Sequence, residues 1–326
     1  MKKRILRSLC ILILLASMLP TAYMSMRNQR ILLDDDTDEL LWQQGTIIYN
    51  QQKYQYNMGI KTYLLMGIDS MEPLSVKENK LKGGQADALF LLVVDTNNKN
   101  WKILSINRNT MTDIQRFDSH GMYKGWINAQ ICIQHGFGDG MEQSCERQMA
   151  AVSRTLLGLP IDGYVAINMG AVPAMNDAIG GVTLTSIEDI LLPQDGIVIS
   201  EGEEIKLQGM NAWAYVVYRD EAELDSASKR LERQKHYIKE AYKTVRNSDT
   251  DKTELISNIY NVVQDYTLMD IPIVELACQI LLYDKDLDEI ATFPGVEVAG
   301  DRFVEYYLDE EKNLEMLIDT YYTKVN

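Results

Sequence analysis

Short apolar runs alternate with segments of helical periodicity along most of the chain, and this alternation restricts the fold more than any other feature. The runs predicted to be buried strands are TYLLMG (62–67), ALFLLVV (88–94), KILSIN (102–107) and GYVAIN (163–168). Helical patterns occupy 142–158, 170–181, 207–219, 226–245, 253–264, 272–283 and 310–322, and further strands are predicted at 289–293 and 302–308. Alternation of this kind predicts the α/β class, with a mixed central β-sheet flanked by helices on both faces.

A basic cluster followed by an apolar segment opens the chain. Lys2, Lys3, Arg4 and Arg7 precede the apolar residues 8–24, a pattern shared by membrane anchors and cleaved signal peptides. We favour a retained membrane helix because no small-x-small cleavage motif follows the apolar core, although that core is shorter than the ~20 residues usual for a span. Since basic residues stay in the cytoplasm, the C-terminal domain is predicted to be extracytoplasmic, on a single-pass protein of the cell membrane.

The predicted organisation has three parts. Residues 1–24 are the anchor or signal segment, and 25–58 are an extracytoplasmic spacer. The spacer ends in TIIYNQQKYQYN, which predicts a β-hairpin that turns around Asn50. Residues 59–326 form one large domain that includes a C-terminal α/β extension, since no linker interrupts them.

The charge balance excludes some classes of partner. The chain has 47 acidic and 32 basic residues and a formal net charge of −15, whereas nucleic acid and anionic lipid surfaces select basic faces. We therefore expect no nucleic-acid partner, and any anion must be bound by a local cluster of cations. The sequence also lacks GxxxxGK[ST], GxSxG and HExxH motifs, which gives nucleotide-binding, serine-hydrolase and zinc-protease functions little support.

The cysteines and histidines leave two alternatives open. Cys132 and Cys145 flank a glycine-rich loop in a domain predicted to be exported, so they either form a disulfide or remain two separate thiols. The three histidines have no metal-ligand spacing, which argues against a zinc site.

A cluster of arginines stands out in this acidic chain. Arg230, Arg233 and Gln234 are related by i, i+3 and i+4, so they share one face of the predicted helix. Arg219 ends the preceding helical pattern and lies within reach of that face. The planar guanidinium group suits phosphate, which predicts an anion site. The alternative is a solvated helix with ordinary surface ion pairs.

Charged side chains also occur at the ends of predicted strands. Asp69 follows the first strand, Asp87 opens the second, and Arg108 follows KILSIN. Strand ends form the edge of an α/β sheet where ligands usually bind, and two carboxylates suffice for Mg²⁺ when phosphates supply further oxygens. The alternatives are turn-forming aspartates and a surface arginine. Taken together, these residues suggest a site for a metal ion and a diphosphate.

Eight motifs in this order resemble the LytR-CpsA-Psr family of bacterial cell-envelope proteins over residues 60–240. The matching segments are YLLMGIDS, GGQADALFLLVVD, LSINRNTM, WINAQI, LGLPIDGYVAINM, NDAIGGVTL, LQGMNAWAYVVYR and RLERQ. The resemblance implies a membrane-anchored phosphotransferase that takes a glycopolymer from a polyprenyl-diphosphate carrier and attaches it to peptidoglycan, with Mg²⁺ as cofactor. It also implies an apolar tunnel for the lipid. We expect helices 148–158 and 210–218 to enclose this tunnel, with its opening near Arg108, whereas the alternative is an ordinary packed core.

Roles are implied for individual residues where they match the family's motifs. The residues implied to be catalytic by holding the diphosphate are Arg108, Arg219 and Arg230. Further substrate-binding residues would be Arg233, Gln234 and Asp225. The residues implied to support Mg²⁺ are Asp69 and Asp87.

Several positions depart from the family's pattern, and three of them lose a basic group. The departures are Gln85, Asn107, Asn109, Trp126, Val217 and Ala227. Loss of one charge-stabilising donor lowers an enzyme's rate by about 10²–10³-fold. The alternative function is therefore a catalytically attenuated relative that binds lipid-linked polymer or wall glycan as an envelope scaffold or regulator.

Overall fold

The protein is described from a computed structural model that covers residues 45–325 except 193–195, 221–222, 224, 273–275, 278–279, 281–282 and 284. The predicted membrane segment and most of the spacer lie outside the described residues, as do Cys10, Cys278 and much of the helix predicted at 272–283. Within the described part, no helix is both long and apolar enough to cross a membrane.

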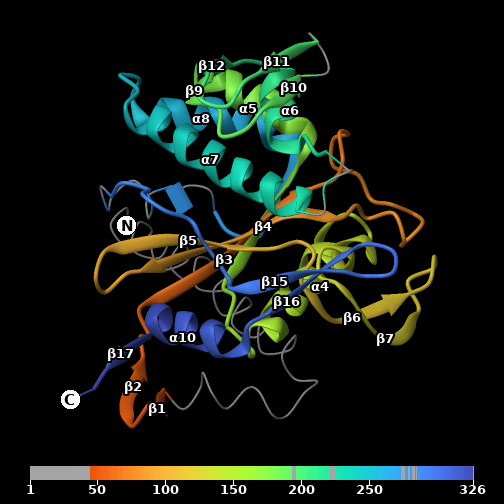
Figure 1. Cartoon of the computed structure of the whole chain (residues 1–326), viewed down its shortest axis with the longest axis vertical. Helices are drawn as coiled ribbons and strands as arrows, with labels where there is room; N and C mark the ends of the chain where they lie inside the picture. Colours follow the sequence, from red (N-terminus) through yellow and green to blue (C-terminus); the bar gives the residue numbers. More distant parts are fainter. Residues whose placement is uncertain are drawn as a thin grey trace, which may run out of the picture.

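A six-stranded sheet forms the centre of the molecule (Figure 1). Its strands, in spatial order, are β13 (Thr267–Met269), β8 (Gly163–Asn168), β3 (Ile60–Ile68), β4 (Ala86–Asp95), β5 (Asn100–Ile106) and β14 (Ala291–Thr292). The pairs β3–β8 and β5–β14 are parallel, whereas β13–β8, β3–β4 and β4–β5 are antiparallel. The predicted mixed sheet is therefore confirmed, although β14 is shorter than the strand predicted at 289–293.

Helices cover both faces of this sheet, as predicted. On one face, Leu64 of β3 and Leu91 of β4 are buried in a core with α4 (Glu142–Thr155) and α10 (Glu310–Tyr321). On the other face, Phe90 packs in a second core with α7 (Ser226–Arg246). Because successive side chains of a strand point to opposite faces, strands buried on both sides are apolar almost throughout. This explains why β3 and β4 were evident in the sequence.

A smaller layer lies against α7, at the top of Figure 1. It contains η1 (Met169–Ala171), α5 (Val172–Ala178), β9 (Val182–Thr185), β10 (Ile190–Leu192), β11 (Ile197–Ile199), β12 (Glu204–Leu207) and α6 (Met210–Val217). Tyr237 of α7 is buried in the core of this layer. The neighbouring segments are α8 (Lys252–Val263) and η2 (Gln264–Tyr266). Helix α6 ends at Val217, two residues before the predicted end, because Tyr218 adopts an extended conformation.

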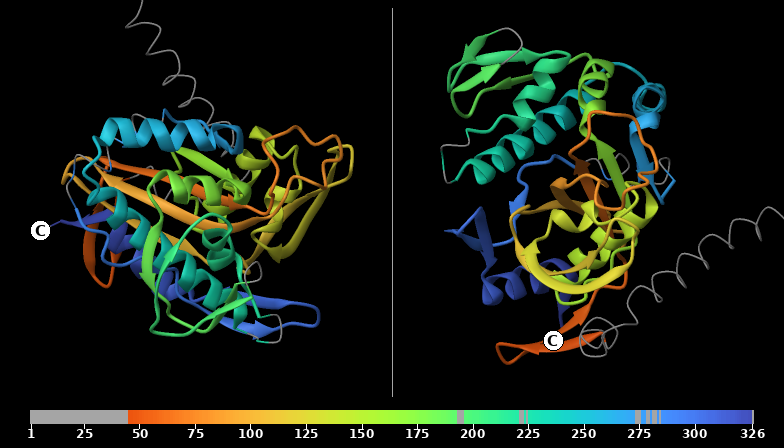
Figure 2. Two further views of the ribbon diagram at one scale, coloured as in Figure 1. Left: turned by 90° about the horizontal axis from the view of Figure 1, so that it is seen from above. Right: turned by 90° about the vertical axis from the view of Figure 1, so that its right-hand side faces the viewer.

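The predicted hairpin near residue 50 is present as β1 (Thr46–Tyr49) and β2 (Gln52–Tyr56). Asn50 and Gln51 have φ values of 46° and 62°, the left-handed geometry of a tight type I′ turn. The C-terminal strand β17 (Tyr322–Lys324) pairs with β2. The hairpin therefore projects at one end of the molecule beside the C-terminus (Figure 2).

The β10–β11 hairpin, two hairpins outside the layer on α7 and a short helix were not predicted as such. The first hairpin joins β6 (Met111–Phe117) to β7 (Tyr123–Gln130), α3 (Ile133–Gly136) follows it, and the second hairpin joins β15 (Gly295–Ala299) to β16 (Val304–Leu308). Only the last five residues of the strand predicted at 302–308 are extended in β16. These hairpins have exposed residues on much of their surface, so they lack the apolar runs that mark buried strands.

Candidate functional site

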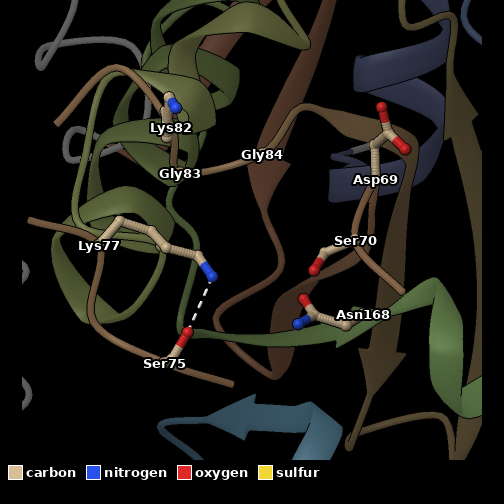
Figure 3. Close-up of a pocket in the computed structure, with 9 residues that line it drawn as sticks. Asp69, Ser70, Ser75, Lys77, Lys82, Gly83, Gly84 and Asn168 are labelled. Carbon is tan, nitrogen blue, oxygen red and sulfur yellow. Dashed lines mark hydrogen bonds between the residues drawn. The ribbon is translucent and has the colours of Figure 1, made fainter. Parts of the chain in front are cut away.

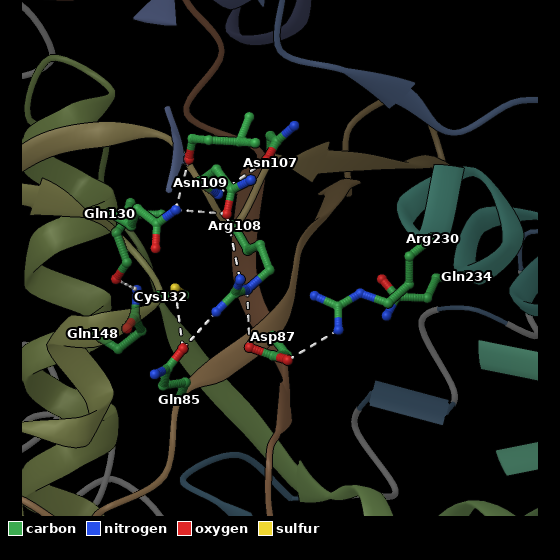
Figure 4. A network of polar contacts seen from close by, with 12 residues as sticks. Gln85, Asp87, Asn107, Arg108, Asn109, Gln130, Cys132, Gln148, Arg230 and Gln234 are labelled. Atoms are coloured by element: carbon green, nitrogen blue, oxygen red, sulfur yellow. Dashed lines mark hydrogen bonds and ion pairs between the residues drawn. The ribbon is translucent and has the colours of Figure 1, made fainter. Parts of the chain in front are cut away.

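Two arginines converge on one carboxylate at the ends of the central strands β4 and β5 (Figure 4). Asp87 lies in β4, Arg108 follows β5, and Arg230 projects from α7. The Nε atom of Arg108 lies 2.9 Å from Oδ1 of Asp87, and Nη1 of Arg230 lies 3.1 Å from Oδ2. Asp87 thus offsets part of the repulsion between two guanidinium groups that were far apart in the sequence.

Neutral side chains complete the surroundings of Arg108. Its Nη2 atom donates to Oε1 of Gln85 at 2.5 Å, and Nη1 donates to Oδ1 of Asn109 at 3.3 Å. Gln130 in turn donates to the same oxygen of Asn109 at 2.9 Å. Gln85 and Asn109 depart from the family's pattern, and here both of them orient Arg108.

Arg230 is buried but incompletely paired. Only 7% of the residue is exposed, and its Nη2 atom has no hydrogen-bond partner among the described residues. Burial lowers the pKa of Arg230 from its usual value, Asp87 opposes this shift, and the positive charges of Arg108 and Arg219 add to it. A buried guanidinium donor without a partner is costly, so this atom is suited to an anionic ligand.

Arg219 and Gln234 lie around the same network. Arg219 is exposed, its Nε donates to Oγ of Ser226 at 3.1 Å, and it lines a polar cavity together with Arg108. Gln234 lies one turn after Arg230 and donates to the carbonyl of Val216 at 3.2 Å. The structure therefore brings the three predicted arginines to one region, while their role in binding stays a prediction.

An apolar cavity of about 370 Å³ adjoins this network on the α7 face of the sheet. Strands contribute Leu65, Phe90 and Ile167, and helices contribute Met175, Val217 and Ile238, among others. The charged residues on its wall, Asp87 and Arg230, belong to the network that holds Arg108, and Gln234 lies beside them. The cavity thus has the form expected of a site for an anion that carries an apolar tail.

One prediction about the walls of this cavity is wrong. Helix 148–158 was expected to enclose it, but Met149 and Val152 of α4 are buried in the core on the opposite face of the sheet. The walls come instead from α5, α6 and α7. Both helices are apolar, and periodicity alone does not tell which face of a sheet a helix will cover.

Two residues expected to bind substrate lie outside the network. Arg233 is 1% exposed, forms an ion pair with Glu188, and donates to the carbonyls of Tyr215 at 2.6 Å and of Tyr218. Its guanidinium therefore holds the end of α6 rather than facing Asp87. Asp225 is exposed and lies 3.5 Å from Lys229 in an i,i+4 ion pair. We leave both residues out of the candidate anion site.

Asp69 supplies a second carboxylate near the network. It lines a polar pocket of about 300 Å³ beside Ser70, Lys77 and Asn168 (Figure 3). Burial and the negative charge of Asp87 raise the pKa of Asp69, against the effect of Arg108 and Arg230. A divalent cation would relieve this repulsion, and two carboxylates with a phosphate fit Mg²⁺. No group of three or more acidic, histidine or cysteine ligands occurs within the described residues.

The two cysteines that flank the glycine-rich loop are separate thiols. Cys132 and Cys145 are both free and buried, so the disulfide alternative is not realised. Burial raises the pKa of Cys132 to about 11, and burial raises that of Cys145 as well. Neither thiol is therefore suited to act as a nucleophile.

The other departures from the family's pattern have identifiable surroundings. The ring of Trp126 stacks with the guanidinium of Arg154 at 4.3 Å. Val217 is part of the apolar cavity wall, and Ala227 lines the polar cavity. Asn107 donates to Oγ of Ser228 at 3.2 Å.

Some residues near Arg108 carried no signal in the sequence. Gln130 orders Asn109, and the turn between β15 and β16, including Phe303, forms part of the polar cavity. These residues are distant in the chain from Arg108. Only a known contact between β16 and the segment at Asn109 and Thr110 would have identified the turn residues.

The chain is similar to known proteins in both sequence and fold. The model of the LytR_cpsA_psr family matches residues 34–320. A relative from Halalkalibacterium halodurans, named polyisoprenyl-teichoic acid–peptidoglycan teichoic acid transferase TagU, is 30% identical over 156 residues, which cover 48% of this chain and 44% of that protein. A relative of the same name from Bacillus licheniformis is 27% identical over 186 residues, covering 56% and 55%. The chain thus spans about half the length of the curated relatives it matches.

Solved structures show the same fold. B. subtilis TagV aligns with a TM-score of 0.60 at 21% identity, covering 80% of this chain and 96% of that one. A structure described as TagT bound to LIIa-WTA aligns with a TM-score of 0.56 at 20% identity, covering 81% and 90%. At this level of identity the likeness concerns the fold.

Proposed function

Because the chain belongs to the LytR-CpsA-Psr family, we propose that it is a phosphotransferase that attaches a glycopolymer from a polyprenyl-diphosphate carrier to peptidoglycan. The observation that carries the proposal is the unpartnered Nη2 of Arg230 beside an apolar cavity. A ligand that satisfies both features combines a phosphate with a long apolar chain. The names of the curated relatives support a polyisoprenyl-linked teichoic acid as the kind of donor and peptidoglycan as the acceptor.

The protein would act outside the cytoplasm, held to the membrane by its N-terminal segment. Members of the family are membrane-associated and extracytoplasmic. The basic residues before the apolar segment support an N-terminus inside the cell. This orientation places the site on the side where polyprenyl-linked polymers meet the cell wall.

The reaction would transfer one phosphoryl group. A hydroxyl of the acceptor forms a bond to the phosphorus next to the glycan, the bond from that phosphorus to the bridging oxygen breaks, and polyprenyl phosphate leaves while the hydroxyl proton is released. The product is a phosphodiester. Arg108, Arg219 and Arg230 would neutralise the charge that builds up on the phosphate oxygens, which is the main protein contribution in such transfers.

Mg²⁺ would be held by Asp69 and Asp87 together with phosphate oxygens, and when bound it would supply further charge neutralisation. Asp69 fits this role because its carboxylate has no hydrogen-bond or ion-pair partner among the described residues, while burial and the charge of Asp87 raise its pKa. Asp87 fits less simply, since each of its oxygens already faces a guanidinium.

Replacing Asp69 with asparagine is expected to raise the Mg²⁺ concentration needed for half-maximal transfer by at least about tenfold, the scale on which changes around a metal site act. The measurement is a Mg²⁺ titration of transfer after treatment with EDTA. Asp319→Asn is the matched control, because Asp319 is exposed on α10 and lies 3.9 Å from Lys102. An unchanged Mg²⁺ requirement in Asp69→Asn would remove this residue from the metal site.

The lipid part of the proposal is tested by narrowing the apolar cavity. Ile167→Trp replaces a branched aliphatic side chain in its wall with a bulky indole ring. The variant is expected to bind farnesyl diphosphate about tenfold more weakly, because each methylene kept out of an apolar site forfeits ~0.8 kcal/mol. Binding of inorganic diphosphate to the same variant is the internal control and should not change. Equal binding of farnesyl diphosphate by both proteins would show that the cavity does not take the lipid.

A non-catalytic binding protein is the second candidate. It is favoured by Gln85 and Asn109, because these neutral side chains occupy two donor atoms of Arg108. A transfer assay with a synthetic polyprenyl-diphosphate oligosaccharide and peptidoglycan fragments distinguishes the two. Donor binding without a phosphodiester product would establish the binding function.

A further inference from the structure

A polar cavity of about 500 Å³ is lined by Arg108, whose ion-pair partner Asp87 lines the apolar cavity. Arg108, Asn109 and Gln130 form one wall, and Arg219 and Ser226 form another. The third wall is the turn of the β15–β16 hairpin, at residues 299–304. The cavity therefore opens beside the proposed diphosphate site but is built partly from the C-terminal extension.

The hairpin is fixed to the segment that carries Arg108. The backbone N–H of Tyr306 donates to the carbonyl of Asn109 at 3.0 Å. Gln130 donates to the carbonyl of Val304 at 2.8 Å as well as to Asn109. The other strand of the hairpin is also held in place, because Ser228 of α7 donates to Glu297 of β15 at 2.7 Å. These contacts hold the third wall at a defined distance from Arg108.

The side chains of the cavity suit a sugar better than a second phosphate or a lipid. Asn109, Gln130 and Ser226 bring neutral amide and hydroxyl groups to its wall, and part of their hydrogen-bonding capacity is used within the protein. Phe303 adds an aromatic ring that is 43% exposed. A pyranose ring has polar edges and an apolar face, so amide and hydroxyl groups match its edges and an aromatic ring matches its face. Glu223 and Asp301 line the same cavity as Arg108, Arg219 and Arg302, and these two carboxylates disfavour a purely anionic ligand.

We propose that this cavity is a carbohydrate subsite in which Phe303 stacks on a pyranose ring next to the reacting phosphate. The inference rests on the proposed function, since it adds the sugar to the diphosphate site at Arg108. Two sources present the same chemistry: the first sugar of the donor and the hydroxyl-bearing sugar of the acceptor glycan. Phe303 would determine specificity for one of them.

The test compares Phe303→Ala with Tyr307→Ala. Tyr307 belongs to the same hairpin, is also 43% exposed, and donates to Glu305 rather than lining the cavity. Phe303→Trp, which keeps an aromatic ring, is the conservative variant. Thermal unfolding of all three variants shows whether the hairpin remains folded, and Phe303→Trp separates loss of the ring from loss of packing.

Three probes distinguish the two possible sources of the sugar. Farnesyl diphosphate has no sugar, farnesyl-diphosphate-linked N-acetylglucosamine represents the donor, and soluble peptidoglycan glycan strands represent the acceptor. Phe303→Ala is expected to weaken binding of one sugar-bearing probe by about tenfold, the scale of a lost aromatic contact, and to leave farnesyl diphosphate unchanged. Tyr307→Ala should bind all three as the unmodified protein does, and Phe303→Trp should restore binding.

The outcomes separate this inference from the function on which it rests. An effect on the donor probe or on the glycan strands supports the subsite and identifies its sugar. If Phe303→Ala binds both sugar-bearing probes as tightly as the unmodified protein, the subsite is overturned. If farnesyl diphosphate does not bind to the unmodified protein, the diphosphate site is wrong, and the glycan strands still decide whether the polar cavity takes a sugar.

Discussion

Replacing Arg230 with alanine is expected to lower the rate of glycopolymer transfer by about 10²–10³-fold, the usual effect of removing one charge-stabilising donor from an active site. Arg230 is 7% exposed, pairs with Asp87 at 3.1 Å and keeps Nη2 without a partner among the described residues. The group is thus held in place by the protein while one donor remains for the substrate. Rates of phosphodiester formation, measured with a synthetic donor and peptidoglycan fragments, give the comparison.

The free energy of unfolding of Arg230→Ala should differ little from that of the unmodified protein. This result would separate a role of Arg230 in binding from a role in stability. Removing Arg230 leaves Asp87 paired with Arg108 at 2.9 Å and removes a cation whose pKa is lowered by burial. Arg230→Lys keeps the charge but loses the planar fork, so it should recover only part of the rate. An Arg230→Ala protein that transfers normally but unfolds easily would contradict the proposed role.

Replacing Arg233 with alanine is expected to lower stability rather than activity. The free energy of unfolding should fall by about 3–5 kcal/mol, as when one partner of a buried ion pair is removed. Arg233 is 1% exposed and holds Glu188 together with the carbonyls of Tyr215 and Tyr218. Its removal leaves a carboxylate and two carbonyl groups at the end of α6 without their donor. Those groups cannot all recover hydrogen bonds inside the protein.

Urea unfolding gives the measurement for Arg233→Ala, with Lys243→Ala as the control on the same helix. Lys243 forms an i,i+3 pair with Glu240 at 2.6 Å and its side chain is 47% exposed, so its loss should cost only about 0–1 kcal/mol. Donor binding at a temperature where both variants are folded should be unchanged. An Arg233→Ala protein of normal stability with weakened donor binding would return Arg233 to the anion site.

Local pattern was sufficient to predict the layers of the fold. The central strands β3 and β4 are buried on both faces, so their apolar runs are nearly continuous and were predicted as strands. The long helix α7 was predicted to within one residue of its end. The turn at Asn50 was also predicted, because short-range geometry determines a tight hairpin.

The candidate site was predictable only as a set of residue types. Arginines and aspartates at the ends of elements indicated an anion site, and Arg108, Arg230 and Asp87 do meet there. Arg233 carried the same signal, yet it faces α6. Two helix positions three residues apart differ in direction by about 60°, which is enough for one guanidinium to face Asp87 and the other to face a neighbouring helix.

By itself, the sequence determined which segments are buried, because burial follows from the period of apolar residues along each segment. It also determined that a strongly acidic chain places arginines after the strand at 102–107, at the end of the helical segment 207–219 and near the start of 226–245. Only the tertiary structure decided which face of the sheet α4 and α7 each cover, and hence where the apolar cavity lies. It alone placed the β15–β16 hairpin beside Asn109. The reason is that these contacts join residues far apart in the chain, nearly two hundred positions in the case of Asn109 and Tyr306. Such pairings depend on the closure of the whole sheet rather than on any local propensity.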